Sequence, residues 1–344
     1  MKHKKVTIKD LAKILNISIS TVSKAMNDSH EISELTKEKV RKAAEKYNYY
    51  PNLMAAGLHS KSTKTIGVVI PNILNYFFVN ALSGIEKETR QRGYRIISCI
   101  SNESYDIEEE SIEMLSKGYV DGIILSLSIG TQKLKKYKHI QAVIKKNLPV
   151  VLFDRVSKEI NCDKIVSDDY QGAYNSTSFL IENKCKNIAL FTTHKDLNVV
   201  KQRKKGYMDA IENAGMKNNK LIANFQYKHS SEEAIKKFLE LHKVDAVFVV
   251  DELLAIKTIK VAKELKLGIP NDIQVIGYAD GELSKEYSPS VSVVNLHAKD
   301  IGRATAKKMI ERLAKKDELR TKMGKTTVVH STLIQRESTL NRKE

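Results

Sequence analysis

The apolar positions of residues 7–48 recur with helical spacing. Thr7 and Asp10 form a capping-box signal at the start of a first helix, and Ser18 is a suitable cap for a second. Asn16 tolerates the left-handed conformation that ends a helix. This region therefore predicts three short helices around one small core. Their apolar faces are Ile8, Leu11, Ala12 and Leu15; Val22, Ala25 and Met26; and Leu35, Val40, Ala43, Ala44 and Tyr47.

From Ile66 the pattern changes to short apolar runs that alternate with amphipathic helices. Near-continuous apolar strands separated by helices are typical of parallel sheets covered on both faces. The runs are too many for one small sheet, so we expect two α/β lobes, with ligands beyond the carboxyl ends of the strands. The predicted strands are 65–71, 95–100, 121–127, 149–154, 164–168, 187–192, 245–250, 273–278, 291–296 and 326–334.

Pro51 ends the helical pattern, and the segment "PNLMAAGLHSKSTK" that follows has weak helical character and polar ends. We interpret this segment as a hinge. The predicted organisation is an all-α helix-turn-helix domain over residues 1–50, a hinge over 51–64, and a two-lobed α/β domain with parallel sheets over 65–340.

The charge balance points to a polyanionic partner. The 344 residues carry a formal net charge of +17, and residues 1–62 contain 12 Lys and Arg against 6 Asp and Glu. No run of eighteen apolar residues occurs, so no membrane span is predicted. The basic N-terminus lacks the apolar segment of a secretory signal, and Cys99, Cys162 and Cys185 show no CxxC spacing. We therefore expect a cytoplasmic protein with reduced thiols.

The spacing of Ala12, Asn16 and Val22 fits a helix-turn-helix, with a small residue at the helix contact, a turn residue and a buried aliphatic. Short hydroxyls suit phosphates and base edges, an aliphatic side chain suits a thymine methyl, and a lysine suits guanine. An ordinary small helical bundle with a polar outer face stays as the alternative at this point. The outward residues of the second helix are Ile19, Ser20, Ser23, Lys24 and Asn27.

Three segments carry a resemblance to a known family. "VTIKDLAKILNISISTVSKAMN", "ISELTKEKVRKAAEKYNYYPN" and "IGVVIPNILNYFF" are similar to the lactose/galactose repressor family of bacterial transcription regulators. The order of helix-turn-helix, hinge and α/β sensor matches over essentially the whole chain, which ends with the similar "LIQREST". The resemblance implies a sensor like the periplasmic sugar-binding proteins, with two lobes crossed three times by the chain and an effector between them.

The resemblance also implies roles in DNA binding. Ile19, Ser20 and Lys24 occupy positions that read bases, and in a dimer the paired hinges would insert Leu58 into the minor groove and bend the duplex. Ile19 departs from the polar residue of some members, which implies a different operator. The residues expected to hold phosphates are Thr7, Ser18, Thr21, Ser23 and Asn27.

An effector pocket is implied in the same way, with aromatic faces against sugar rings, carboxylates for hydroxyls and an arginine fork. The expected residues are Phe77, Phe78, Asp154, Arg155, Arg203, Asp251 and Asp280. Two departures affect the identity of the effector. Asp251–Glu252 replaces the usual Asn-Asp pair, and "GYADG" places Ala279 where many members have an aspartate, with Asp280 one residue later.

The expected function is a homodimeric, sequence-specific transcription regulator, in effect a repressor, whose affinity for double-stranded operator DNA responds to a small carbohydrate-like effector. The tail after Glu337 shows no heptad, which favours a dimer over a tetramer. An exported sugar receptor is one alternative, and it would need a signal peptide. An α/β enzyme is another, and it would need a catalytic cluster.

No cofactor, metal site or catalytic site is predicted. "MGKTT" resembles the end of a phosphate loop, but Leu319 stands where that loop requires glycine. His194, His229 and His242 are isolated in the sequence and are interpreted as solvated side chains. The operator sequence and the effector stay open, as does whether the effector acts as inducer or co-repressor. Whether the outcome is repression or activation also stays open, because the position of the operator decides it.

Overall fold

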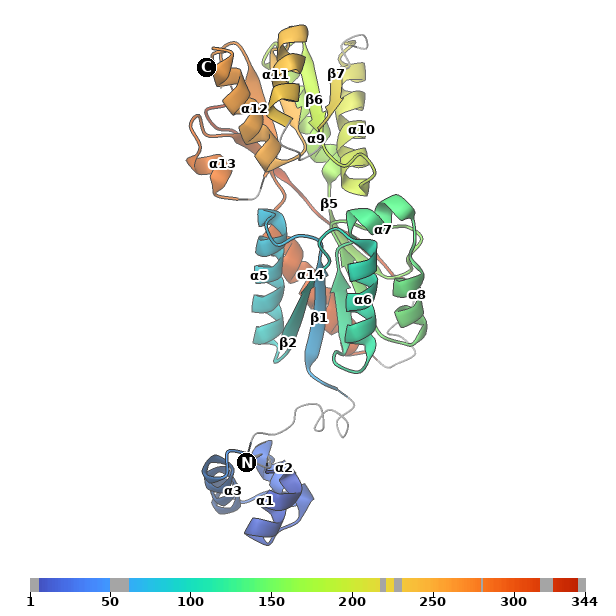
Figure 1. The fold of residues 1–344 in the computed structure, drawn as a ribbon, viewed down its shortest axis with the longest axis vertical. Helices are drawn as coiled ribbons and strands as arrows, with labels where there is room; N and C mark the ends of the chain where they lie inside the picture. The colour runs from blue at the N-terminus through green and yellow to red at the C-terminus, as the bar shows by residue number, and fades with distance from the viewer. Residues whose placement is uncertain are drawn as a thin grey trace. The chain divides into compact units, whose positions relative to one another are not determined.

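The computed structural model describes residues 6–49, 62–216, 221–225, 231–279, 281–315 and 324–339. The chain divides into two compact units, Met1–Thr63 and Lys64–Glu344, which we call the head unit and the two-lobed unit (Figure 1). Leu58 and most of the predicted hinge lie outside the described residues, as does Asp280. No described helix has the length and apolar character needed to cross a bilayer.

Within residues 6–49 the head unit forms helices α1 (Ile8–Leu15), α2 (Ile19–Met26) and α3 (Glu34–Lys46). The Thr7 hydroxyl accepts a hydrogen bond from the Asp10 amide at 3.3 Å, and the Asp10 carboxylate accepts one from the Thr7 amide at 3.0 Å. This capping box satisfies amides that the first turn would otherwise leave without partners.

The core of the head unit joins all three helices through Leu11, Val22 and Val40, each fully buried. Leu35 departs from the prediction, because its exposed fraction is 65%. Leu35 precedes Val40 by five residues, and five residues of an α-helix turn through about 500°, or one full turn plus roughly 140°. Leu35 therefore points away from the buried face. The buried position at the end of this region is Tyr49, with an exposed fraction of 8%.

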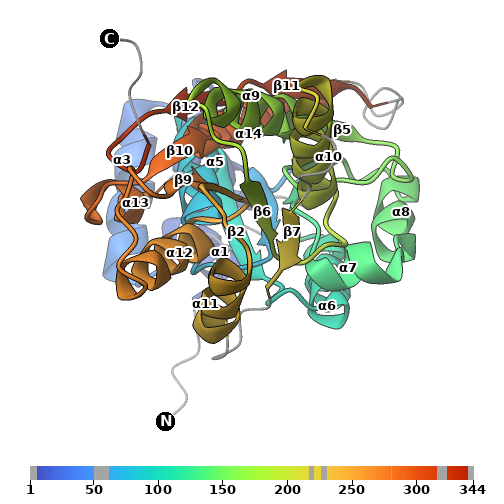
Figure 2. The same ribbon diagram turned by 90° about the horizontal axis from the view of Figure 1, so that it is seen from above.

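The first lobe of the two-lobed unit contains a six-stranded parallel sheet in the order β11-β5-β4-β3-β1-β2. Most of its apolar runs are the predicted ones, and helices cover the sheet (Figures 1 and 2). Its elements are β1 (Thr65–Ile70), α5 (Tyr76–Gln91), β2 (Arg95–Ile100), α6 (Tyr105–Ser116), β3 (Gly122–Leu125), α7 (Ile129–Leu134), α8 (Lys138–Lys145), β4 (Val150–Phe153), β5 (Asp163–Ser167), α14 (Ala298–Leu313) and β11 (Thr326–Val329).

The second lobe contains a six-stranded sheet in the order β12-β10-β9-β8-β6-β7, parallel except for β12. The short strand β7 was not predicted. The elements are α9 (Asp169–Glu182), β6 (Ile188–Thr192), α10 (Asn198–Asn213), β7 (Leu221–Asn224), α11 (Ser231–Leu241), β8 (Ala246–Val249), α12 (Glu252–Glu264), β9 (Gln274–Ala279), α13 (Leu283–Glu286), β10 (Ser292–Asn295) and β12 (Thr332–Ile334).

The chain crosses between the lobes three times: after β5, after β10 and after β11. The prediction of one strand over 326–334 is therefore wrong, because β11 pairs in the first sheet and β12 in the second. The crossings are tied together by Asp168, whose carboxylate accepts hydrogen bonds from the Ser331 amide at 2.8 Å and from His330 Nδ1 at 3.0 Å. The crossings therefore hold the carboxyl ends of the first sheet against the second lobe.

Each lobe contains one close helix pair that depends on glycine. A Cβ atom added to Gly302 of α14 would lie 2.1 Å from the Ala81 carbonyl oxygen of α5. A Cβ atom added to Gly84 of α5 would lie 2.2 Å from the Lys299 carbonyl oxygen of α14. In the second lobe a Cβ on Gly206 of α10 would lie 2.2 Å from the Tyr170 carbonyl of α9. Backbone atoms cannot move aside as a flexible side chain can, so these positions exclude larger residues.

We expect Gly302→Ala to lower the free energy of unfolding of the two-lobed unit by about 1–3 kcal/mol, because the added methyl forces α14 away from α5. Urea denaturation followed by circular dichroism measures this change. Lys307→Ala is the control, since Lys307 is exposed on the same helix. Equal stability of the two variants would contradict the close contact of the helices.

Candidate functional site

Helix α2 exposes the residues that the sequence predicts for base contact. Val22 and Ala25 are fully buried, while the exposed fraction of Ile19 is 44% and Ser20 and Lys24 are also exposed. Asn27 is exposed at the end of the helix, and Thr21 and Ser23 are half-buried. The outer face of α2 thus offers one aliphatic group, several short polar groups and one lysine.

Two of the predicted phosphate-binding residues also hold the head unit together. The Ser18 hydroxyl accepts a hydrogen bond from the Thr21 amide at 3.0 Å and lies 2.7 Å from the Ser20 hydroxyl. Thr7 donates its hydroxyl hydrogen to Asp10 at 2.7 Å. Their hydroxyl oxygens keep remaining hydrogen-bonding capacity, so the capping role is compatible with contact to a phosphate.

Lys24 has a partner that the sequence analysis missed. Its ammonium forms an ion pair with Glu31, seven residues away in the turn before α3. Both side chains are about half exposed, at 48% and 53%, so the pair contributes little to stability. A polyanion can therefore compete with Glu31 for Lys24.

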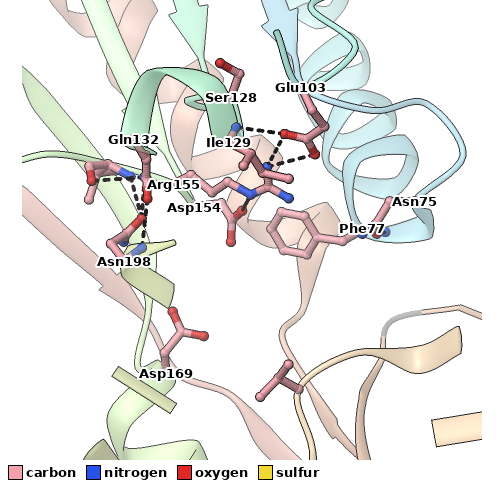
Figure 3. A network of polar contacts seen from close by, with 12 residues as sticks. Asn75, Phe77, Glu103, Ser128, Ile129, Gln132, Asp154, Arg155, Asp169 and Asn198 are labelled. Atoms are coloured by element: carbon pink, nitrogen blue, oxygen red, sulfur yellow. Dashed lines mark hydrogen bonds and ion pairs between the residues drawn. The ribbon is translucent and has the colours of Figure 1, made fainter. Parts of the chain in front are cut away.

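In the two-lobed unit, Asp154 and Arg155 directly follow β4, at the carboxyl edge of the first sheet. Asp154 adopts a left-handed backbone conformation with φ 56°. Its carboxylate is buried, and its oxygen lies 3.9 Å from Arg155 Nε. It accepts no hydrogen bond from any residue within the described ranges. Figure 3 shows this carboxylate facing the space that Phe77 and Asp169 border.

Burial raises the pKa of Asp154 to about 6, against the opposing effect of the Arg155 guanidinium. A buried carboxylate is costly to ionise unless it is paired and hydrogen-bonded. The protonated form of Asp154 is therefore favoured over a wider pH range than that of an exposed aspartate.

Arg155 is occupied by Glu103, which no sequence signal singled out. Arg155 Nη1 donates to both carboxylate oxygens of Glu103, at 2.9 and 2.7 Å. The guanidinium carbon also lies 5.1 Å from the ring centre of Phe78. Glu103 in addition accepts a hydrogen bond from the Ile129 amide at 2.9 Å, which caps α7 (Figure 3).

The expectation of two open aromatic faces differs from the structure. Phe78 has an exposed fraction of 1% and lies in the hydrophobic core, where its ring meets that of Phe153 edge to face. Phe77 has an exposed fraction of 8% and packs against Phe78 at 5.3 Å between ring centres. Phe78 thus lies in the core with the Arg155 guanidinium over its ring, whereas Phe77 lies beside Arg155 and Asp154 in Figure 3.

Arg203 of α10 is expected to offer a fork of donors, and the structure shows these donors in use. Nε and Nη2 contact the Asp169 carboxylate at 2.7 Å, and Nη1 donates to the Val250 carbonyl at 2.8 Å. The guanidinium also stacks on the Tyr278 ring, 3.7 Å from its centre. Burial works to lower the pKa of Arg203, but the Asp169 carboxylate raises it above the usual value. Removing one partner of such a buried pair typically costs about 3–5 kcal/mol.

Asp251 and His194 complete the polar surroundings from the second lobe. Asp251 caps α12, where its Oδ1 accepts a hydrogen bond from the Leu254 amide at 3.1 Å. His194 is half-buried, and burial together with the nearby Arg155 charge lowers its pKa. His194 is therefore only partly exposed, less than the sequence analysis expected. His242 packs on Phe238, and His229 lies outside the described residues.

Serine hydroxyls at the same sheet edge are a further feature that the sequence analysis missed. Ser101, Ser126 and Ser167 follow or end β2, β3 and β5, and their buried oxygens have no hydrogen-bond partner. Because β5, β4 and β3 are neighbours in one parallel sheet, Ser167 and Ser126 stand at the ends of the two strands on either side of β4. Buried groups of this kind are uncommon in proteins and call for an explanation.

The two lobes are joined beside the cleft by an amide pair. Gln132 Nε2 donates to Asn198 Oδ1 at 2.6 Å, and the Asn198 amide donates to Gln132 Oε1 at 2.8 Å. The Val156 amide donates to the same Asn198 oxygen at 3.2 Å (Figure 3). These bonds connect α7 of the first lobe with the start of α10 in the second. Among the residues that the structure describes, no cluster of side chains could hold a metal ion.

Comparison with known proteins places both units in one family. Residues 7–52 match the bacterial regulatory proteins of the lacI family, and residues 63–337 match the periplasmic binding proteins and sugar binding domain of the LacI family. The chain is 32% identical over 339 residues to the HTH-type transcriptional regulator RegA of Clostridium saccharobutylicum, covering 97% of this chain and 99% of that one.

Two further proteins are similar over most of the chain. The HTH-type transcriptional repressor PurR of Vibrio atlanticus is 30% identical over 315 residues, covering 90% of this chain and 93% of that one. The crystal structure of the lac repressor dimer bound to operator and the anti-inducer ONPF aligns with a TM-score of 0.84 at 21% identity. It covers 98% of this chain and 100% of that one.

We expect Asp154→Asn to raise the free energy of unfolding at pH 8 by about 1–3 kcal/mol. The pKa of Asp154 is about 6 in the folded protein against an ordinary 3.8. Between these values the folded protein keeps a proton that the unfolded chain has lost. The stability of the unsubstituted protein therefore falls as the pH rises through this interval, and the loss persists above it.

Urea denaturation between pH 4 and pH 8 measures the effect, and the advantage of the variant should shrink toward pH 4. Asparagine tolerates the left-handed backbone at this position. Asp106→Asn, on the exposed surface of α6, is the matched control. An advantage that is the same at every pH would show that the charge of Asp154 is not its source.

Proposed function

The chain belongs to the LacI family of bacterial regulatory proteins, and we propose that it is a homodimeric repressor whose affinity for operator DNA changes when a sugar or sugar derivative binds between its lobes. As a family member it is a DNA-binding transcription regulator with a ligand-binding sensor region. The observation that carries the proposal is the outer face of α2, which is exposed above a fully buried Val22 and Ala25.

On the DNA we assign base reading to Ile19, Ser20 and Lys24. A helix in the major groove presents such groups to base edges, where a lysine donates to guanine O6 or N7 and an aliphatic group contacts a thymine methyl. Phosphates on either side are assigned to the short polar side chains, which position the helix without reading sequence. These residues are Thr7, Ser18, Thr21, Ser23 and Asn27.

A dimer is supported by an exposed apolar surface on the two-lobed unit. Leu74, Tyr76 and Val79 of the first lobe have exposed fractions of 88%, 47% and 41%. Leu253 and Leu283 of the second lobe are exposed by 46% and 44%. A Cβ added to Gly281, two residues before Leu283, would lie 2.8 Å from Tyr76 Cγ, so the two groups adjoin. Exposed apolar side chains that gather across both lobes in this way favour an interaction site.

An effector between the lobes can act on DNA binding only through a difference in its affinity for two arrangements of the protein. The cleft has groups on both lobes, so a ligand that contacts Asp154 and Asp251 together favours one spacing of the lobes. Allosteric proteins couple two binding sites with a typical free energy of about 1–3 kcal/mol, and we expect a coupling of this size here. The sugar assignment draws on the description of the matched sensor family. We place the protein in the cytoplasm with the DNA that it binds.

Selection of bound sequences from a random DNA pool tests the proposal. The expected result is an inverted repeat, since a dimer presents two copies of α2. A selection that enriches no sequence, with and without added sugars, would contradict a sequence-specific regulator.

We expect Lys24→Ala to weaken binding to the selected operator by about 1–3 kcal/mol, because a base contact is lost in each half-site. Fluorescence anisotropy at fixed salt measures the affinity. Lys39→Ala is the control, because it removes the same charge from an exposed position on α3. Equal weakening by both variants, on specific and random DNA alike, would limit Lys24 to a general electrostatic role.

We expect Leu74→Glu to convert the dimer to a monomer, because it places a charge within the exposed apolar surface. Sedimentation equilibrium measures the mass, and operator affinity should fall with it. Leu241→Glu, at a site with an exposed fraction of 74% on α11, is the matched control. A dimer that survives Leu74→Glu would place the dimer interface elsewhere.

A further inference from the structure

The first lobe carries a run of lysines that no neighbouring carboxylate in the sequence neutralises. Residues 129–149 contain six lysines and no aspartate or glutamate. Four of these lysines are exposed at the end of α7 and the start of α8. None of the four forms an ion pair within the described residues, whereas Lys117 of the same lobe is paired with Glu113. The four are Lys133, Lys135, Lys136 and Lys138.

Lysines on α10 of the second lobe continue this surface. Residues 197–208 contain four basic residues and no acidic one, and three of the four are exposed lysines. Lys201 and Lys205 follow Asn198 by three and seven residues, so the three side chains form one row along the helix. Because Asn198 is hydrogen-bonded to Gln132 of α7, this row begins beside the lysines of the first lobe.

These lysines form one surface, which we call the basic face. Figures 1 and 2 place α7, α8 and α10 on one side of the two-lobed unit and α5, α12 and α13 on the other. The apolar surface proposed for the dimer belongs to α5, α12 and α13, so dimer formation leaves the basic face of each protomer accessible. The basic face consists of Lys133, Lys135, Lys136, Lys138, Lys201 and Lys205.

Carboxylates on neighbouring elements border the basic face without pairing with its lysines. Tyr105 of α6 has the Lys136 ammonium 5.7 Å from its ring centre and donates its hydroxyl hydrogen to Glu109 at 2.9 Å. On α10, Asp209 is half-buried and accepts a hydrogen bond from Tyr170 at 3.0 Å. The surface therefore keeps an excess of positive charge.

The side chains of the basic face suit a phosphate backbone better than a protein surface. Among the large apolar side chains of residues 129–149 and 197–208, Leu134 alone is exposed, at 51%. Protein interfaces usually have an apolar centre with few charges, whereas contact with a nucleic acid backbone requires spaced cations. Residues 1–62 account for +6 of the formal net charge of +17, so +11 remains on the rest of the chain.

We propose that the basic face is a second DNA-binding surface, which contacts the phosphates of a further duplex segment while the head units occupy an operator. Duplex DNA is the polyanion that a member of this family already meets through its head unit. Exposed ammonium groups bind phosphate oxygens and release counterions, so the basic face binds DNA without reading its sequence. A dimer with one basic face on each protomer can therefore hold an operator and a second stretch of duplex together.

The experiment uses the full-length protein with its head units filled by a short, unlabelled duplex of the selected operator. A labelled duplex of random sequence is then added at about 50 mM salt, and fluorescence anisotropy follows its binding. Stepwise addition of salt gives the slope of the logarithm of the binding constant against the logarithm of the salt concentration.

Two triple variants are compared. Lys133→Gln/Lys136→Gln/Lys201→Gln removes three charges from the basic face. Lys236→Gln/Lys237→Gln/Lys243→Gln is the matched control, because it removes the same charge from exposed positions on and just after α11.

We expect the operator-filled protein to bind the second duplex. The basic-face variant should bind it about 10-fold or more weakly, with a salt slope that is smaller by about 2–3, because three phosphate contacts are lost. The control variant should keep most of the affinity and the slope. Both variants should bind the short operator duplex equally well, because their substitutions lie outside the head unit.

An operator-filled protein that does not bind the second duplex would overturn the inference. Equal weakening by the two triple variants would also overturn it, because net charge would then explain the effect. Polyglutamate is the competing probe, and binding of polyglutamate in place of the duplex would assign the basic face to an acidic protein surface. Loss of operator binding itself would instead refute the proposed function, and the same titrations report it separately.

Discussion

Three crossings of the chain between two sheets constrain the rest of the two-lobed unit. Asp168 ties the first crossing to the third through Ser331 and His330, and His297 at the second crossing hydrogen-bonds Thr332 at 2.9 Å. These ties keep the carboxyl edge of the first sheet against the second lobe. The polar side chains at that edge can be satisfied either by hydrogen bonds within the protein or by solvent or a bound molecule.

Most of the charged side chains at this edge form ion pairs or hydrogen bonds within the protein. The Arg155–Glu103 pair also caps α7, and α7 carries Gln132, which reaches Asn198 in the other lobe. The Arg203–Asp169 pair is packed against Tyr278, whose hydroxyl donates to the Asp169 carbonyl at 2.8 Å. The two arginines that the family resemblance implies as ligand groups, Arg155 and Arg203, thus also have partners within the protein. The Asp154 carboxylate is buried and, among the described residues, has the Arg155 guanidinium only at 3.9 Å. Burial without a close partner makes such a carboxylate costly to ionise.

The head unit meets a different constraint, because its core is small. Thr7 and Ser18 cap the N-termini of α1 and α2, and both are among the residues proposed for phosphate contact. The Lys24–Glu31 ion pair adds little stability, because both side chains are about half exposed. The capping side chains of the head unit are thus among those proposed for contact with DNA.

Local patterns in the sequence determined the helices of the head unit, the outward face of α2, the change to alternating strands and helices near Ile66, and the position of Asp154 at a strand end. Each of these follows from periodicity or capping within a few residues, which the chain carries in any context. Tertiary structure decided the partners: Glu103 lies 52 residues from Arg155, and Asp169 lies 34 residues from Arg203. It also decided that 326–334 divides between two sheets and that Phe78 is buried. Pairing and burial of this kind depend on contacts between distant segments, and no local period records them.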